Sequence, residues 1–240
     1  MAPTSANGAN TFSVVRAQRE LFGWATASAY YAYFTQDSAK YLSVSGNERR
    51  DSIDARFAAK INGFDGDLEV MVQTGSIGSD SIRAWAVGSL SGYTFAGIGW
   101  TPRLGFQFDA ASGDSNPHDN VLQTFNPLFP NGYYFSLAGY TGYTNLIHVK
   151  PSLTLTVAVA AQWRETTADA VYTQGNVPVP GTAGQAGRYT GTYGQLRLDW
   201  AINSHSSFAV EAVRFDVGNA IKRAGGHNSD YLGVQISNAW

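Results

Sequence analysis

Apolar and polar residues alternate with a period of two along most of this 240-residue chain. In residues 50–61, for example, Ile53, Phe57 and Ile61 share one phase, and the other phase holds Arg50, Asp54, Arg56 and Lys60. Side chains of a β-strand point alternately to its two faces, so the pattern predicts strands with one apolar and one polar face. We expect strands, and hardly any helix, at residues 22–35, 49–61, 64–75, 80–95, 102–111, 145–157, 158–172, 188–202, 206–217 and 229–240.

The connections between these strands alternate between short and long. Asn62-Gly63 and residues 203–205 are tight turns, whereas residues 36–47, 113–133, 174–187 and 218–229 are long and rich in Gly, Pro and Asn. Outer-membrane barrels have short periplasmic turns and longer extracellular loops. The chain is therefore predicted to be all-β, an antiparallel transmembrane β-barrel of about ten strands or part of a larger one.

The predicted barrel occupies residues 22–240, after an N-terminal extension at residues 1–21. One boundary is poorly marked, because the alternation continues past Val157 without a Gly, Asn or Asp. We expect a tight turn there, since one unbroken strand would be about twice as long as the hydrocarbon core is thick.

Composition is compatible with a barrel in the bacterial outer membrane. Charged residues make up 14% of the chain and mean hydropathy is −0.18. A barrel strand needs only about 9–11 residues, of which every second one is apolar, so its average hydropathy resembles that of a soluble protein. The net charge of −2 argues against nucleic-acid binding. Residues 1–11 lack a signal peptide, which we expect either to have been removed or to precede a longer parent chain.

The last strand resembles the C-terminal assembly signal of outer-membrane barrels. Leu232, Val234, Ile236 and Trp240 fall on one face of it, with the aromatic residue at the end. This likeness implies the outer-membrane assembly machinery as a partner, besides the lipid bilayer and lipopolysaccharide that a barrel contacts.

Several motifs resemble the bacterial alginate export family, in that family's order. They are Glu48-Arg49-Arg50, Ile82-Arg83-Ala84-Trp85, Pro102-Arg103-Leu104-Gly105, Ser112-Gly113-Asp114, the segment from Thr124 to Pro130, and Trp163-Arg164. The resemblance covers most of residues 48–240, the C-terminal portion of a family whose barrels have about eighteen strands. It implies a conduit for an anionic polysaccharide, with a positively charged constriction.

A conduit for a polyuronate, or for small anions, needs cations spaced along its path that do not hold the polymer permanently. Arginine suits this task, because its planar fork pairs with carboxylates. If the polar phase of each strand points inward, the lumen contains Arg50, Arg56, Lys60, Arg83, Arg103, Lys150, Arg164 and Arg197, together with Asp54, Asp67, Glu69, Asp109 and Asp199. Narrow barrels also fill their interiors with arginine–carboxylate ladders, so a structural role for each residue is equally compatible with the pattern.

We expect no catalysis, no metal and no cofactor, because the four histidines are scattered and no nucleophile elbow or phosphate loop is present. The rival hypothesis is a plugged or partial barrel that does not conduct and has a structural or adhesive role. A soluble β-sandwich ranks third, since it does not explain the alternating connector lengths or the terminal Trp240.

Overall fold

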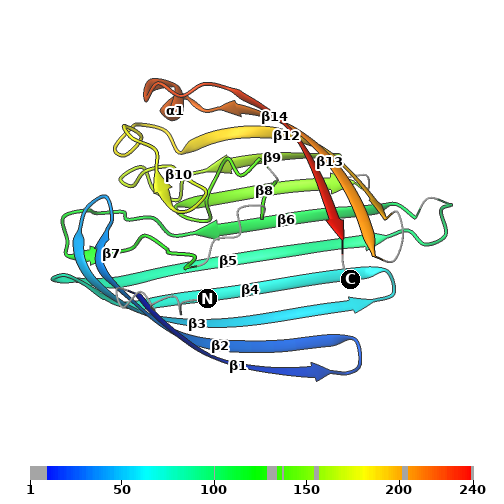
Figure 1. Cartoon of the computed structure of the whole chain (residues 1–240), viewed down its shortest axis with the longest axis horizontal. Coiled ribbons are helices and arrows are strands. Elements are labelled where there is room, and N and C mark those ends of the chain that lie inside the picture. The colour runs from blue at the N-terminus through cyan, green and yellow to red at the C-terminus, as the bar shows by residue number, and fades with distance from the viewer. Residues whose placement is uncertain are drawn as a thin grey trace, which may run out of the picture.

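The computed structural model describes residues 10–99, 101–128, 134–136, 138–153, 157–201 and 205–238. Its main sheet is an antiparallel meander in which strands follow one another in chain order (Figure 1). The successive strands of the meander are β1 (Asn10–Leu21), β2 (Ala25–Lys40), β3 (Ser45–Ile61), β4 (Phe64–Ile77), β5 (Asp80–Thr94), β6 (Arg103–Ala111), β8 (Leu146–Leu153), β9 (Val157–Trp163), β12 (Tyr189–Ala201), β13 (Ser206–Val217) and β14 (Ser229–Asn238).

Shorter elements lie in the long connections. Strand β7 (Val121–Leu122) pairs in parallel with β5, and β10 (Tyr172–Thr173) pairs with β11 (Val177–Pro178). Helix α1 (Asn219–Arg223) lies between β13 and β14. All these elements are at the end of the sheet that carries the long connections, and the short turns are at the opposite end (Figure 1).

Each predicted strand has a counterpart, but the expectation of an N-terminal extension over residues 1–21 is wrong for its second half. Residues Asn10–Leu21 form β1, which pairs with β2 without a break. Phe12 and Val14 lie on the same face as Arg16 and Gln18, because all four are an even number of residues apart. This mixed composition hides the alternation by which the other strands were recognised.

The expected turn near Val157 is consistent with the pairing of its flanking strands. β8 and β9 are antiparallel neighbours in which Leu153 pairs with Val157. The turn itself, at residues 154–156, lies outside the described residues. The strand predicted at 158–172 ends at Trp163, after which the chain enters a long loop.

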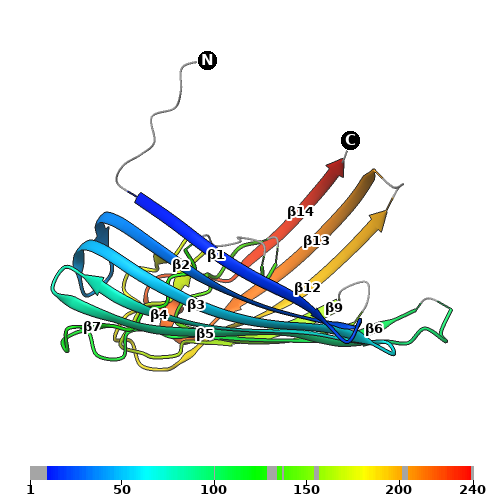
Figure 2. The ribbon, with the colours of Figure 1, turned by 90° about the horizontal axis from the view of Figure 1, so that it is seen from below.

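The sheet is strongly curved, and its two faces differ in composition. Figure 2 shows a trough whose edge strands, β1 and β14, stand apart from each other. The convex face carries exposed apolar side chains on nearly every strand, among them Ile53, Val70, Val72, Leu104, Phe106, Val159 and Leu196. Such a surface is typical of the lipid-facing side of a membrane barrel.

The two longest loops connect β6 to β8 and β9 to β12, and their described residues cover part of the concave face near its long-loop end. Phe125 from the first loop packs into a buried cluster with Ala84, Ala86 and Ala111 of the sheet. A second cluster joins Val171 of the other loop to Tyr193, Phe215 and neighbouring residues of β12 and β13. The core of this chain therefore lies between the sheet and its own loops.

Candidate functional site: the charged concave wall

Most of the residues predicted for a lumen do share the concave face. On β3 this face carries Arg50, Asp54, Arg56 and Lys60, and the cross-strand partner of Arg56 is Glu69 on β4. Further predicted residues on this face are Arg103 and Asp109 on β6, Lys150 on β8, Arg164 after β9, and Arg197 and Asp199 on β12. The period of two was thus a sound guide to the face on which these side chains lie.

Arg83 is the exception, and its predicted place in the lumen is wrong. It is exposed on β5 between the buried Ile82 and Ala84, so it shares the convex face with Trp85. The inward phase of β5 consists of apolar residues and glycines, and Phe125 of the first long loop packs against its alanines. Polarity therefore does not mark the inward phase on this strand.

Arg50 lies inside the wall and is not accessible. It has no exposed surface, and its Nε atom donates to Glu48 Oε1 at 2.5 Å. Its other nitrogens donate to Gln73 at 2.7 Å and to the hydroxyl of Tyr41 at 3.1 Å. Asn126 of the first long loop also donates to Tyr41, at 2.9 Å. Arg50 is therefore part of a buried polar cluster that joins the sheet to this loop.

Arg164 is likewise fully buried, and the second long loop folds around it. Its guanidinium donates to the backbone carbonyls of Thr182, Gln185 and Gly187 at 2.6, 2.7 and 2.5 Å, and to that of Asp169 at 3.4 Å. Arg164 therefore holds the second long loop in place. Its predicted position on an open substrate path is wrong.

Accessible cations remain nearer the short-turn end of the wall. Arg56 donates to Asp67 Oδ1 at 2.7 Å, and Arg103 donates to Asp65 Oδ1 at 2.9 Å. Both pairs are bidentate. The arginine side chains retain 42% and 35% of their exposure. Lys60, the cross-strand partner of Asp65, is exposed as well.

Arg197 makes the same kind of contact farther along the sheet. It donates to both carboxylate oxygens of Asp199 and lies 3.5 Å from the buried Glu211. The open part of the wall thus holds arginine–carboxylate pairs that solvent reaches. Because solvent reaches these pairs, an incoming anion can approach the guanidinium groups and compete with the aspartate carboxylates.

Asp109 and Lys150 belong to a largely buried hydrogen-bond network. The sequence pattern predicted these two residues on the inward face, but not their partners. Asp109 accepts hydrogen bonds from Tyr134 at 2.8 Å and Gln107 at 3.0 Å, and lies 2.9 Å from His148 Nδ1. The second ring nitrogen of His148 lies 2.9 Å from the hydroxyl of Tyr193. Lys150 donates to the carbonyl of Phe135, a loop residue, at 2.8 Å.

His148 could have been predicted to lie on the concave face, because it occupies the inward phase of β8 in the sequence pattern. Tyr134 lies in a loop and carries no periodic mark, so the sequence offers no comparable signal for it.

The C-terminal strand presents the expected apolar row. Leu232, Val234 and Ile236 on β14 are each more than 60% exposed on the convex face. Trp240, the last member of the predicted assembly signal, lies outside the described residues.

Three comparisons relate this chain to known proteins, and the family match is the one that supports the membrane interpretation. The alginate export family profile matches residues 2–235. Among solved structures, LpxR from Salmonella typhimurium is similar over 95% of this chain and 88% of its own, with 9% identity and a TM-score of 0.39. No curated protein sequence matches the chain. No helix among the described residues combines the length and apolar character needed to cross a membrane.

The family match confirms the resemblance inferred from the motifs, and the antiparallel sheet with its apolar convex face confirms the predicted all-β barrel class. Since the match spans nearly the whole chain, this protein belongs to the alginate export family, with an export or porin-like role in the outer membrane.

Proposed function

We propose that this chain forms the wall of a passive conduit that carries an anionic polysaccharide, or small anions, across the outer membrane. The observation that carries the proposal is the set of accessible arginine–aspartate pairs on the concave wall, above all Arg56–Asp67 and Arg103–Asp65. The function is transport and not catalysis, in keeping with the family.

Paired arginines suit a polymer that must keep moving. An unpaired guanidinium in a narrow lumen would hold a polyuronate carboxylate for a long time, whereas one already paired exchanges one carboxylate for another. Because the pairs sit on β3–β4 and β4–β6, the polymer would meet Lys60, Arg56 and Arg103 within one patch of wall.

The proposed orientation puts the short turns in the periplasm and the long loops outside the cell. The apolar convex face contacts the bilayer, and the loop end meets lipopolysaccharide. β14 is the segment that the outer-membrane assembly machinery would recognise. No nucleic acid takes part.

A second candidate is a plugged or partial wall that does not conduct. It is favoured by the burial of Arg50 and Arg164, because both arginines are bound within clusters that join the loops to the sheet. In this alternative the remaining arginine–aspartate pairs only neutralise charge.

Ion selectivity separates the two candidates. The full chain is refolded into detergent, inserted into a planar bilayer, and its reversal potential is measured in a salt gradient. The double variant Arg56→Ala with Arg103→Ala should shift the reversal potential toward cation selectivity and weaken block by added polyuronate. Arg83→Ala removes one positive charge from the convex face and should leave both the reversal potential and the polyuronate block unchanged.

Unchanged selectivity in the double variant would refute the role of this wall. Absence of any channel, with heat-modifiable β-structure still present, would favour the plugged wall.

A further inference from the structure

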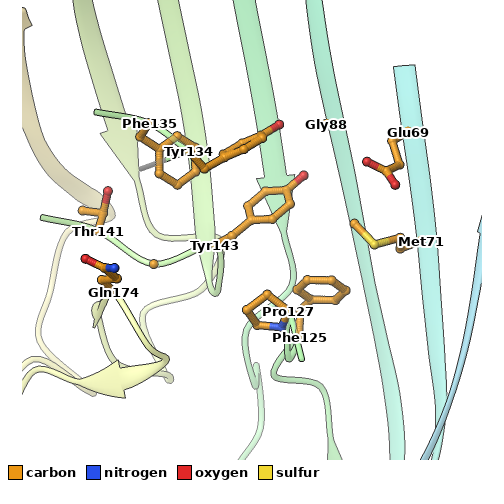
Figure 3. A pocket seen from close by; sticks show the side chains of 11 residues that line it. Glu69, Met71, Gly88, Phe125, Pro127, Tyr134, Phe135, Thr141, Tyr143 and Gln174 are labelled. Carbon is orange, nitrogen blue, oxygen red and sulfur yellow. The ribbon is translucent and has the colours of Figure 1, made fainter. Parts of the chain in front are cut away.

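A cavity of about 260 Å³ lies between the concave face and the first long loop (Figure 3). Four aromatic rings line it, from Phe125, Tyr134, Phe135 and Tyr143. Tyr143 is within 6.0 Å of each of the other three rings, measured between centroids. Glu69 of β4 stands on the opposite side of the cavity in Figure 3. The cavity thus has an aromatic side and a carboxylate side.

The hydroxyl of Tyr143 is buried and makes no hydrogen bond within the described part of the chain. In Figure 3 the hydroxyls of Tyr134 and Tyr143 both point toward the side of the cavity where Gly88 and Glu69 lie. Buried hydroxyls without partners are rare in proteins, because burial removes their hydrogen bonds to water. Because the ring of Tyr143 lines the cavity, a small rotation of this side chain would bring the unsatisfied hydroxyl to a polar ligand.

Gly88 leaves the room that these hydroxyls need. A Cβ atom at this position would lie 3.0 Å from the Tyr143 hydroxyl, 3.1 Å from the Tyr134 hydroxyl and 3.2 Å from Asp109 Oδ1. Any side chain would therefore crowd three polar atoms at once. A neighbouring cavity of about 230 Å³ shares Glu69, Gly88 and Tyr134 and reaches Arg56, so the pocket adjoins the accessible wall.

We propose that this pocket binds an uncharged pyranose ring. The apolar C–H face of a sugar packs against aromatic rings, and its hydroxyls both donate and accept hydrogen bonds. The pocket offers a donor at Tyr143, an acceptor at Glu69 and an amide at Gln174. The volume is below the roughly 300–1,000 Å³ of pockets for drug-sized ligands, which suits a single ring.

The charges and donors of the pocket disfavour two other classes of ligand, uronates and organic ammonium ions. A uronate would bring its carboxylate close to Glu69, with Asp109 beside Gly88 at the same end of the cavity, and like charges in a poorly solvated cavity repel strongly. An organic ammonium would suit the carboxylate and the rings, but it has no acceptor for the hydroxyl hydrogen of Tyr143. The site is therefore chemically distinct from the proposed arginine wall.

The test is ligand-observed NMR of the full chain with methyl α-D-glucopyranoside in a polyoxyethylene detergent, since glucoside and maltoside detergents would compete. Tyr143→Phe should weaken binding about tenfold, the usual value of one hydrogen bond in a buried site, and should keep or raise the melting temperature. Tyr140→Phe is the matched control. It also removes a buried hydroxyl that has no hydrogen-bond partner among the described residues, but it lies outside the pocket lining, so sugar affinity should not change.

Glu69→Gln tests the charge of the ligand. The amide still accepts a hydrogen bond, so glucoside affinity should stay within about threefold, whereas an ammonium ligand would be lost. The proposal is overturned if glucoside does not bind, if Tyr143→Phe binds it as well as the wild type, or if galacturonate or tetramethylammonium binds more tightly. The anion selectivity that depends on Arg56 and Arg103 is a separate readout, so failure here leaves the proposed conduit standing.

Discussion

Arg164 gives the most direct test of how the second long loop is held. Replacing it with alanine removes three short hydrogen bonds to Thr182, Gln185 and Gly187, and one longer bond to Asp169. A hydrogen bond to a charged group contributes about 1.5–3 kcal/mol, but bonds to one guanidinium are not additive, and water replaces part of the loss when the loop opens. We expect the opening free energy of residues 165–187 to fall by about 3–5 kcal/mol.

Hydrogen exchange with mass spectrometry measures that change directly. At about 1.4 kcal/mol per factor of ten, amide exchange in residues 165–187 should accelerate roughly a hundredfold to a few thousandfold. Strands β3 and β4, which do not contact Arg164, should exchange as in the wild type.

Arg223→Ala is the control for this prediction. Arg223 donates to Gln185 and to the carbonyl of Ala186 from an exposed position, so its loss should accelerate exchange by less than about tenfold. If Arg164→Ala changed exchange no more than Arg223→Ala does, the loop would not depend on the buried guanidinium, and the bracing role would be refuted.

Two further predictions concern the loops and the lipid face. Burial, together with the nearby Asp169, raises the pKa of Asp114 above its ordinary value of 3.8, so the folded loop retains a proton that the unfolded loop releases. Loop stability should fall as pH rises from that ordinary value through the raised pKa. Asp114→Asn should remove this dependence in hydrogen exchange of residues 112–128 compared at pH 4.5 and 7.5, and a dependence that persists would contradict the assignment. On the convex face, Val70→Lys should cost about 2–4 kcal/mol in denaturant unfolding from vesicles, whereas Ser91→Lys, near the short turns, should cost about 0–1 kcal/mol. Equal costs would contradict the placement of Val70 in the bilayer.

The sheet could be predicted from the sequence because its period is local. Ile53, Leu68 and Leu196 each lie between two polar neighbours, so a few consecutive residues indicate which face of the strand is apolar. Strand β1 was not predicted, because Phe12 and Val14 share a face with Arg16. Neither face of this strand is therefore consistently apolar. Arg83 was assigned to the wrong face because the inward phase of β5 is apolar, where it packs against Phe125 from a loop that is remote in sequence.

The candidate site depends on contacts that no local pattern records. The cavity needs Tyr143 and Phe125 from a loop, Gly88 from β5 and Glu69 from β4, and no spacing within one strand brings these together. The loop motif from Thr124 to Pro130 was visible as a family feature. Its role in packing Phe125 against the sheet follows only from the fold.

The contrast between Arg164 and Arg56 shows why the loops and the wall should be separable in function. Both arginines occupy the inward phase, yet Arg164 is enclosed by backbone carbonyls, whereas Arg56 pairs with the partly exposed Asp67. Because carbonyls cannot leave a braced loop, Arg164 cannot exchange partners with a passing anion, whereas Arg56 can.

Loosening the loop through Arg164→Ala should therefore raise conductance in the bilayer while the reversal potential, set by Arg56 and Arg103, stays the same. A shift in selectivity without a rise in conductance would mean that Arg164 itself faces the path, and the division between a bracing loop and a selective wall would have to be abandoned.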